Sequence, residues 1–137
     1  MKTIISICIA LFFTFVCACE RVEENYLSEN VEYAAAQYDL LIEKLEKNGK
    51  PWAPRTVDTK GNIVYARNVW DWTSGFFAGS LWYLYNLTGD EKWKTLAKKY
   101  TEALKQQQYI TSHHDIGFII GCSYLNGMRM GQEAYDT

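Results

Sequence analysis

Apolar residues recur at steps of three and four along residues 29–47, with charged residues between them, which is the pattern of one buried helix face. The apolar positions of this segment are Val31, Ala35, Tyr38, Leu41, Ile42 and Leu45. We predict a helix from Glu29 to Lys47 that has Ser28 as its N-cap and ends at Asn48-Gly49. The next segment, residues 51–71, is expected to form a loop that turns at Lys60-Gly61-Asn62.

Three further helices are predicted along the rest of the chain. The second runs from about Ser74 to Leu87, and Thr88-Gly89 ends it. The third begins at the cap Asp90 and runs to about Gln108, and the fourth runs from about Asp115 to Tyr124 or Asn126. The candidate caps of the second helix are Asp71, Thr73 and Ser74. The apolar stripe of the third helix consists of Trp93, Leu96, Ala97, Tyr100 and Leu104.

The four helices alternate in character. The first and third carry charged residues, whereas the second and fourth are neutral nearly all round and must be buried on most sides. This alternation predicts an all-α fold with two concentric layers of helices, and the short Thr88-Gly89 link predicts antiparallel neighbours. Both neutral helices contain small residues that let backbones approach closely. These residues are Gly75, Ala78, Gly79 and Ser80 in one helix and Gly117, Gly121 and Ser123 in the other.

The first 18 residues have the pattern of a signal peptide. A lysine precedes an unbroken run of apolar and hydroxyl residues from Thr3 to Ala18, which is shorter than a transmembrane helix requires. The following "VCAC", residues 16–19, resembles a bacterial lipobox with Cys19 as the lipidated residue. We expect residues 1–18 to be removed and residues 19–28 to form a polar tether, which makes the protein an exported lipoprotein anchored to a bacterial membrane, in the periplasm or at the outer membrane. An ordinary secretory signal cut nearby is the alternative.

Charge, cysteines and histidines exclude several classes of function. The net charge of −2 gives no sign of a nucleic-acid partner. Cys122 is the single cysteine after the signal, and its expected role is that of a small buried hydrophobe. The lysines of the third helix are expected to form a solvated face. No metal or other cofactor is predicted, because His113 and His114 are adjacent and lack a second ligand group at metal-binding spacing.

Two polar and aromatic clusters each precede a neutral helix: "NVWDWTSGFF" before the second and "TSHHDIGF" before the fourth. Both clusters should therefore lie at N-terminal ends of the inner layer, where free N–H groups favour anionic ligands such as a uronate carboxylate. Tryptophan faces also stack on sugars, and the aromatic fraction of 15% is high. Asp115 is open to two interpretations at this point, a simple N-cap of the fourth helix or a functional carboxyl group.

The stretches "DWTSGFFAGSLWYLYNLTGDEKW" and "HHDIGF" resemble those of glycoside hydrolase family 88, the unsaturated glucuronyl hydrolases. That family carries a W-T-x-G-F-x-x-G stretch, an L-T-G-D-like helix junction and then H-H-D-x-G-F, and the match covers about residues 68–124 in the same order. The resemblance implies an (α/α)6 barrel. Residues 29–137 would then be the N-terminal part of a truncated glycoside hydrolase domain, with the first helical hairpins of a six-hairpin toroid.

The resemblance also implies a chemistry. The substrates would be oligosaccharides, released from glycosaminoglycans by polysaccharide lyases, that carry a 4,5-unsaturated uronic acid at the non-reducing end. In that family an aspartic acid protonates C4 of the vinyl ether, water adds at C5, and the hemiketal then expels the remaining sugar. Asp115 matches one of two catalytic aspartates, Trp72 matches the tryptophan that stacks on the unsaturated ring, and His114 matches a substrate-binding histidine.

The second catalytic aspartate would lie beyond the end of this chain, so we expect the chain to be inactive alone. Without neighbouring helices, the inner faces of the second and fourth helices would form an exposed apolar patch. The residues expected on that patch are Phe76, Leu81, Leu84, Phe118 and Ile119. Two other functions remain as alternatives: a family 105-type unsaturated rhamnogalacturonyl hydrolase, and a non-catalytic, lipid-anchored sugar-binding module.

Overall fold

The computed structural model describes residues 25–66, 71–112, 114–133 and 135. The predicted signal peptide, Cys19 and His113 lie outside the described residues. Within the described part, no helix is long and apolar enough to cross a membrane. The chain divides into two compact units, Met1–Tyr38 and Asp39–Thr137.

The first predicted helix is already present at Asn25, where the described residues begin. Residues 25–38 are helical in the first unit, and the second unit opens with helical residues 39–46. The Ser28 hydroxyl donates a 3.4 Å hydrogen bond to the carbonyl oxygen of Asn25 within this helix. The N-cap prediction for Ser28 is therefore wrong, whereas the predicted end agrees with the positive φ of Gly49, 68°.

Part of the predicted loop is a β-hairpin. Strands β1 (Ala53–Val57) and β2 (Ile63–Ala66) pair antiparallel, with Ala53 opposite Ala66, Val57 opposite Ile63 and an irregularity between Pro54 and Thr56. The turn lies where it was predicted. The Asp58 carboxylate accepts hydrogen bonds of 2.8 Å from the backbone N–H groups of Lys60 and Asn62, and Gly61 takes a φ of 80°.

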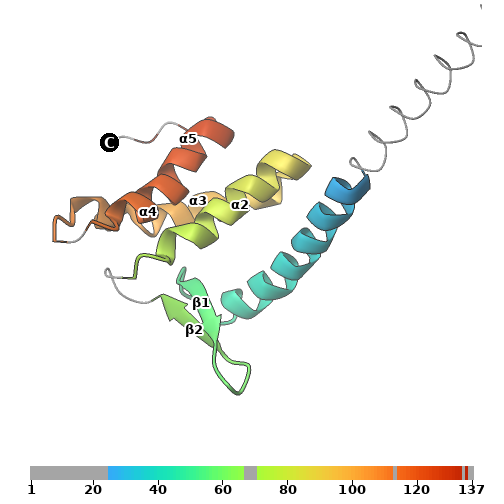
Figure 1. Cartoon of the computed structure of the whole chain (residues 1–137), viewed down its shortest axis with the longest axis horizontal. Coiled ribbons are helices and arrows are strands. Elements are labelled where there is room, and N and C mark those ends of the chain that lie inside the picture. Colours follow the sequence, from blue (N-terminus) through green and yellow to red (C-terminus); the bar gives the residue numbers. More distant parts are fainter. Residues whose placement is uncertain (1–24, 67–70, 113, 134, 136–137) are drawn as a thin grey trace, which may run out of the picture. The chain divides into compact units, whose positions relative to one another are not determined.

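The helices of the second unit pack around α2 (Ser74–Thr88), which contacts both α3 (Glu91–Glu102) and the helical run of residues 116–130 (Figure 1). That run consists of α4 (Ile116–Ile120), a π-helical turn η2 (Gly121–Leu125) and α5 (Asn126–Met130). It continues beyond the predicted end. The third predicted helix is shorter than expected, because Leu104 leaves the helical region (φ −96°, ψ 0°) before the 3-10 turn η1 (Lys105–Tyr109).

The core lies between α2, α3 and the run of residues 116–130. Trp82 is fully buried there, and its indole N–H donates a 3.0 Å hydrogen bond to the Thr101 hydroxyl. Leu81, Leu84 and Ile119 are also buried, so they do not belong to an exposed apolar patch as predicted. They are covered because α2 and α4 already pack within this unit. Two residues predicted for the patch, Phe76 and Phe118, are exposed.

Two of the predicted small residues explain how closely α2 approaches the run of residues 116–130. A Cβ added at Gly75 would lie 2.3 Å from the carbonyl oxygen of Ile119, and one at Gly79 would lie 2.6 Å from that of Cys122. Real Cβ atoms do not come this close to backbone atoms, so these positions require glycine. The prediction that small residues permit close backbone approach is wrong for Gly117 and Gly121, where an added Cβ would meet open space.

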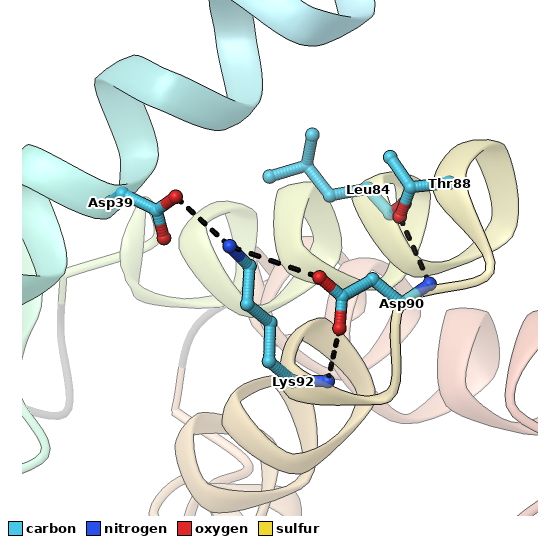
Figure 2. Close-up of polar contacts among 5 residues, drawn as sticks. All are labelled: Asp39, Leu84, Thr88, Asp90 and Lys92. Atoms are coloured by element: carbon cyan, nitrogen blue, oxygen red, sulfur yellow. Dashed lines mark hydrogen bonds and ion pairs between the residues drawn. The ribbon is translucent and has the colours of Figure 1, made fainter.

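The junction between α2 and α3 confirms the predicted helix end and cap (Figure 2). Gly89 closes α2 in the left-handed conformation, with φ 68°. The Asp90 carboxylate accepts a 2.9 Å hydrogen bond from the backbone N–H of Lys92, as an N-cap should. The Lys92 ammonium lies 2.9 Å from one Asp39 oxygen and 3.8 Å from one of Asp90, so it bridges the two acids.

We expect Asp90→Ala to lower the free energy of unfolding by about 1 kcal/mol, because it removes the capping acceptor of α3. Asp90→Asn is the matched control. It keeps an acceptor for the Lys92 N–H and loses an exposed ion pair that contributes at most about 1 kcal/mol and often much less. Urea unfolding of the three proteins measures the difference. Equal losses in both variants would show that the charge, and not the cap, carries the effect.

The lysines of α3 face carboxylates, which agrees with the predicted solvated face. Lys94 and Lys98 lie 3.4 Å and 2.8 Å from the two carboxylate oxygens of Glu133, and Lys99 pairs with Glu46 at 2.6 Å. The hydrogen bond from Lys98, with help from Lys94, holds the pKa of Glu133 below its ordinary value. The pairs with Glu133 connect α3 to the segment that follows α5, and the pair with Glu46 connects α3 to the end of the helix before β1, so the lysines also contribute to the fold.

Candidate active site

A tight turn immediately before α2 presents Trp72. The backbone N–H of Ser74 donates a 3.0 Å hydrogen bond to the carbonyl oxygen of Asp71, which closes the turn around Trp72 and Thr73. The Asp71 side chain accepts from the Thr73 N–H at 3.2 Å and from the Thr73 hydroxyl at 2.6 Å. Thr73 occupies the N-cap position of α2, yet its side chain forms no capping hydrogen bond. Asp71 is therefore the polar side chain that organises this helix start.

Trp72 forms an aromatic cluster with Phe76 of α2 and Phe118 of α4. The ring centroids of Trp72 lie 5.5 Å from those of Phe76 and 5.9 Å from those of Phe118, and the two phenylalanines are 6.3 Å apart. Each of the three side chains is partly open to solvent, with 39–51% of its surface exposed. Half-exposed aromatic rings of this kind offer stacking surface to a sugar. Sequence reasoning assigned Trp72 but not the two phenylalanines, which it placed only on an apolar helix face.

Asp115 stands at the N-cap position of α4, but its carboxylate makes no capping hydrogen bond. The Asp115 Oδ1 atom instead lies 2.8 Å from Nδ1 of His114. The His114 ring is almost fully exposed, whereas the Asp115 side chain is 30% exposed. The backbone carbonyl of Asp115 begins α4 by accepting a 2.9 Å hydrogen bond from the Phe118 N–H. The carboxylate is thus left to interact with His114.

The two polar clusters come together at neighbouring helix starts, as the sequence predicted. Phe118 lies one turn after Asp115 and its ring contacts Trp72. The close approach of Gly75 to Ile119 fixes the same ends of α2 and α4 beside each other. A molecule that stacks on the aromatic cluster would therefore lie near the Asp115–His114 pair.

Arg55, a residue that sequence reasoning did not single out, belongs to the surroundings of this turn. Its Nη1 atom lies 3.3 Å from Oδ2 of Asp71, whose side chain is only 6% exposed. Arg55 comes from β1, and β1 packs against α2. No local sequence pattern indicates the contact between Arg55 and Asp71. The contact depends on the β-hairpin, and this segment was expected to be a loop.

Metal chemistry and cysteine chemistry find no support among the described residues. No group of three or more His, Cys, Asp and Glu side chains in that part of the chain could hold a metal ion. Burial raises the pKa of the Cys122 thiol, which disfavours the reactive thiolate. The candidate chemistry of this site therefore rests on the Asp115 carboxyl group, the His114 imidazole and the aromatic cluster.

Comparison with known proteins points to one kind of enzyme. No protein-family model matches the chain. The unsaturated glucuronyl hydrolase of Formosa agariphila is 29% identical over 94% of this chain, and that of Bacillus sp. strain GL1 is 36% identical over 51% of it. A crystal structure of an unsaturated glucuronyl hydrolase specific for heparin matches 61% of this chain, with 42% identity and a TM-score of 0.57.

The chain is homologous to part of the unsaturated glucuronyl hydrolases. The resemblance to glycoside hydrolase family 88 is thereby confirmed, and so is the helical fold class, because the solved relative is similar in both sequence and structure. The chain spans 34% of the length of the Formosa agariphila relative, 19% of the Bacillus relative and 22% of the solved chain. The roles of Asp115, Trp72 and His114 stay predictions.

Proposed function

We propose that this chain supplies one part of the active site of an unsaturated glucuronyl hydrolase. Its substrates would be oligosaccharides that end in a 4,5-unsaturated glucuronic acid, the products of polysaccharide lyases. One observation carries the proposal: the Asp115–His114 pair lies one helical turn from a half-exposed aromatic cluster that includes Trp72. The homology to enzymes of this name supports the choice of reaction.

Each residue has a role that its surroundings allow. The Trp72 face would hold the flat, unsaturated ring by stacking, and Phe76 and Phe118 would pack against the Trp72 ring. Asp115 would act on the double bond or orient it, because its carboxylate forms no bond to the amides of α4. His114 would orient that carboxylate and contact the substrate, since the pair is 2.8 Å apart and the imidazole is exposed.

The proposed reaction adds water across a vinyl ether. A carboxylic acid donates a proton to C4, water attacks C5, and the resulting hemiketal opens with loss of the remaining sugar. This chemistry needs a second carboxyl group besides Asp115, which the family resemblance places outside this chain. We therefore propose that the chain binds one side of the substrate and is inactive alone.

A hybrid enzyme tests the function. In this protein, which we call the hybrid enzyme, the present chain replaces the matching segment of the Formosa agariphila relative. We expect the hybrid enzyme to consume an unsaturated glucuronyl disaccharide, followed by loss of the ultraviolet absorbance of the 4,5-double bond, whereas the present chain shows no turnover. Circular dichroism and gel filtration establish that the hybrid enzyme is folded. A folded, monodisperse hybrid enzyme without turnover would contradict the proposal.

Trp72→Ala in the hybrid enzyme is expected to raise KM by about ten-fold, roughly 1.4 kcal/mol of binding, with little change in kcat. Stacking acts on the bound substrate and the transition state alike, so its loss weakens binding uniformly. Tyr83→Ala is the matched control, because Tyr83 is an exposed aromatic residue of α2 outside the aromatic cluster. A rise in KM of equal size in both variants would show that Trp72 has no special role.

A further inference from the structure

The Asp71 carboxylate is buried beside the candidate site, and among the described residues it contacts three hydrogen-bonding or charged groups. Its Oδ1 atom accepts from the backbone N–H and from the hydroxyl of Thr73, at 3.2 Å and 2.6 Å. Its Oδ2 atom lies 3.3 Å from Nη1 of Arg55. None of these contacts involves the Asp115–His114 pair, so the function of this second acid needs an explanation of its own.

The contacts of Asp71 enclose the backbone of Trp72. The Asp71 carbonyl accepts from the Ser74 N–H and the Asp71 carboxylate accepts from the Thr73 N–H, so one residue closes the turn twice. Trp72 lies between these two closures. The direction in which its side chain leaves the backbone is therefore set by Asp71.

The orientation of Trp72 needs such a constraint, because burial does not supply one. The Trp72 side chain is 42% exposed, and the two contacts with its neighbours Phe76 and Phe118 are edge-on or tilted, with interplanar angles of 88° and 60°. Aromatic contacts of this type are weak, about 0.5–1.5 kcal/mol beyond burial of the rings. Among the described residues these are the ring contacts of Trp72, so where the indole lies also depends on the backbone that places its Cα and Cβ atoms.

Arg55 supplies the positive charge that offsets the cost of burying the Asp71 carboxylate. A carboxylate that is 6% exposed requires hydrogen bonds and an opposite charge, and removal of one partner leaves an uncompensated buried charge. The guanidinium group comes from β1, which packs against α2. The hairpin is thereby connected to the turn that presents Trp72.

We propose that Asp71, with Arg55 as its counter-charge, is a positioning residue for Trp72. It holds the indole face in the orientation that receives the sugar ring, and it does not touch the substrate. The substrate part of this inference rests on the function proposed above, whereas the orientation of Trp72 does not. The alternative is that Asp71 contributes only to the stability of the helix start.

Fluorine NMR of the 137-residue chain labelled with 5-fluorotryptophan tests the positioning role without any turnover. The Trp72 resonance is assigned by its absence in Trp72→Phe. We expect Asp71→Ala to shift and broaden this resonance, because the ring samples several orientations, while the buried Trp82 and Trp93 keep theirs. Asp71→Asn keeps an acceptor for the Thr73 N–H and Arg55→Gln keeps the carboxylate, so both should give smaller changes in the same direction.

Asp58→Asn is the matched control, because the Asp58 carboxylate likewise accepts backbone N–H hydrogen bonds in a turn, from Lys60 and Asn62. It should leave the Trp72 resonance unchanged. An unchanged Trp72 resonance in Asp71→Ala, with Trp82 and Trp93 also unchanged, would overturn the proposal. Asp71→Ala could unfold the chain and thereby shift all tryptophan resonances. In that case Asp71→Asn and Arg55→Gln provide the test, and an unchanged Trp72 resonance in both variants would overturn the proposal.

The hybrid enzyme separates this inference from the proposed function. We expect Asp71→Asn to raise KM, with kcat/KM falling by less than the roughly ten-fold expected for Trp72→Ala, since a misplaced binding group costs part of what its removal costs. A merely structural acid would lower stability without changing KM. If the Trp72 resonance responds while the hybrid enzyme shows no turnover, the positioning role holds and the function fails. If Trp72→Ala raises KM while the Trp72 resonance stays unchanged in the Asp71 variants, the function holds and the positioning role fails.

Discussion

Asp115→Asn in the hybrid enzyme is expected to lower kcat on the order of 10²-fold or more while the protein remains folded. The substitution keeps the size and hydrogen-bonding shape of the side chain and removes its capacity to exchange a proton. Steady-state kinetics on an unsaturated glucuronyl disaccharide measure the loss. The structure favours this outcome because the Asp115 carboxylate lies against His114 and makes no capping hydrogen bond to α4.

The competing interpretation of Asp115, a helix cap, makes a different prediction. Asn caps helices about as well as Asp, so a cap role would change the free energy of unfolding by only a few tenths of a kcal/mol and leave turnover normal. Asp90→Asn is the matched control, since Asp90 does cap a helix, α3, through its carboxylate. It should leave kcat unchanged. Wild-type turnover in Asp115→Asn would make Asp115 a structural residue and remove the catalytic half of the proposed function.

The helices could be predicted because their signals are local. The start of α2 at Ser74, the glycine that ends it and the cap Asp90 all depend on residues within one turn. The points where the helical conformation is interrupted depend on contacts beyond one turn. Leu104 leaves the helical region, and a 3.0 Å hydrogen bond from the side-chain amide of Asn126 reaches the Cys122 carbonyl within the π-helical turn η2. These details follow from packing and not from apolar spacing.

The hairpin and its ion pair could not be predicted from the same kind of signal. Strand β1 has five residues and β2 has four, which is too short for alternation to stand out, and Pro54 further weakens a strand pattern. The contact between Arg55 and Asp71 follows only once the hairpin packs on α2. By contrast, the meeting of Trp72 with the start of α4 was predictable in outline, because both polar clusters precede neutral helices.

The aromatic cluster depends on how α2 and α4 are placed against each other, and that placement depends on one glycine. Any side chain at position 75 would push against backbone atoms of Ile119, which lie 2.3–2.9 Å from an added Cβ. Backbone atoms cannot rotate away as a flexible side chain can. Trp72 lies three residues before Gly75, and Phe118 lies one residue before Ile119. The contact between the Trp72 and Phe118 rings therefore requires that position 75 stay a glycine.

Gly75→Ala is expected to lower the free energy of unfolding by about 1–3 kcal/mol, the usual cost of overpacking a tight contact. Gly117→Ala is the matched control on the partner helix, because an added Cβ there meets open space. Alanine is the better helix former, so the control should gain up to about 1 kcal/mol. Urea unfolding of both variants, with the Trp72 fluorine resonance as a local probe, measures the two effects. Equal or greater stability of Gly75→Ala, with an unchanged Trp72 resonance, would show that α2 and α4 do not depend on a close backbone contact to build the aromatic cluster.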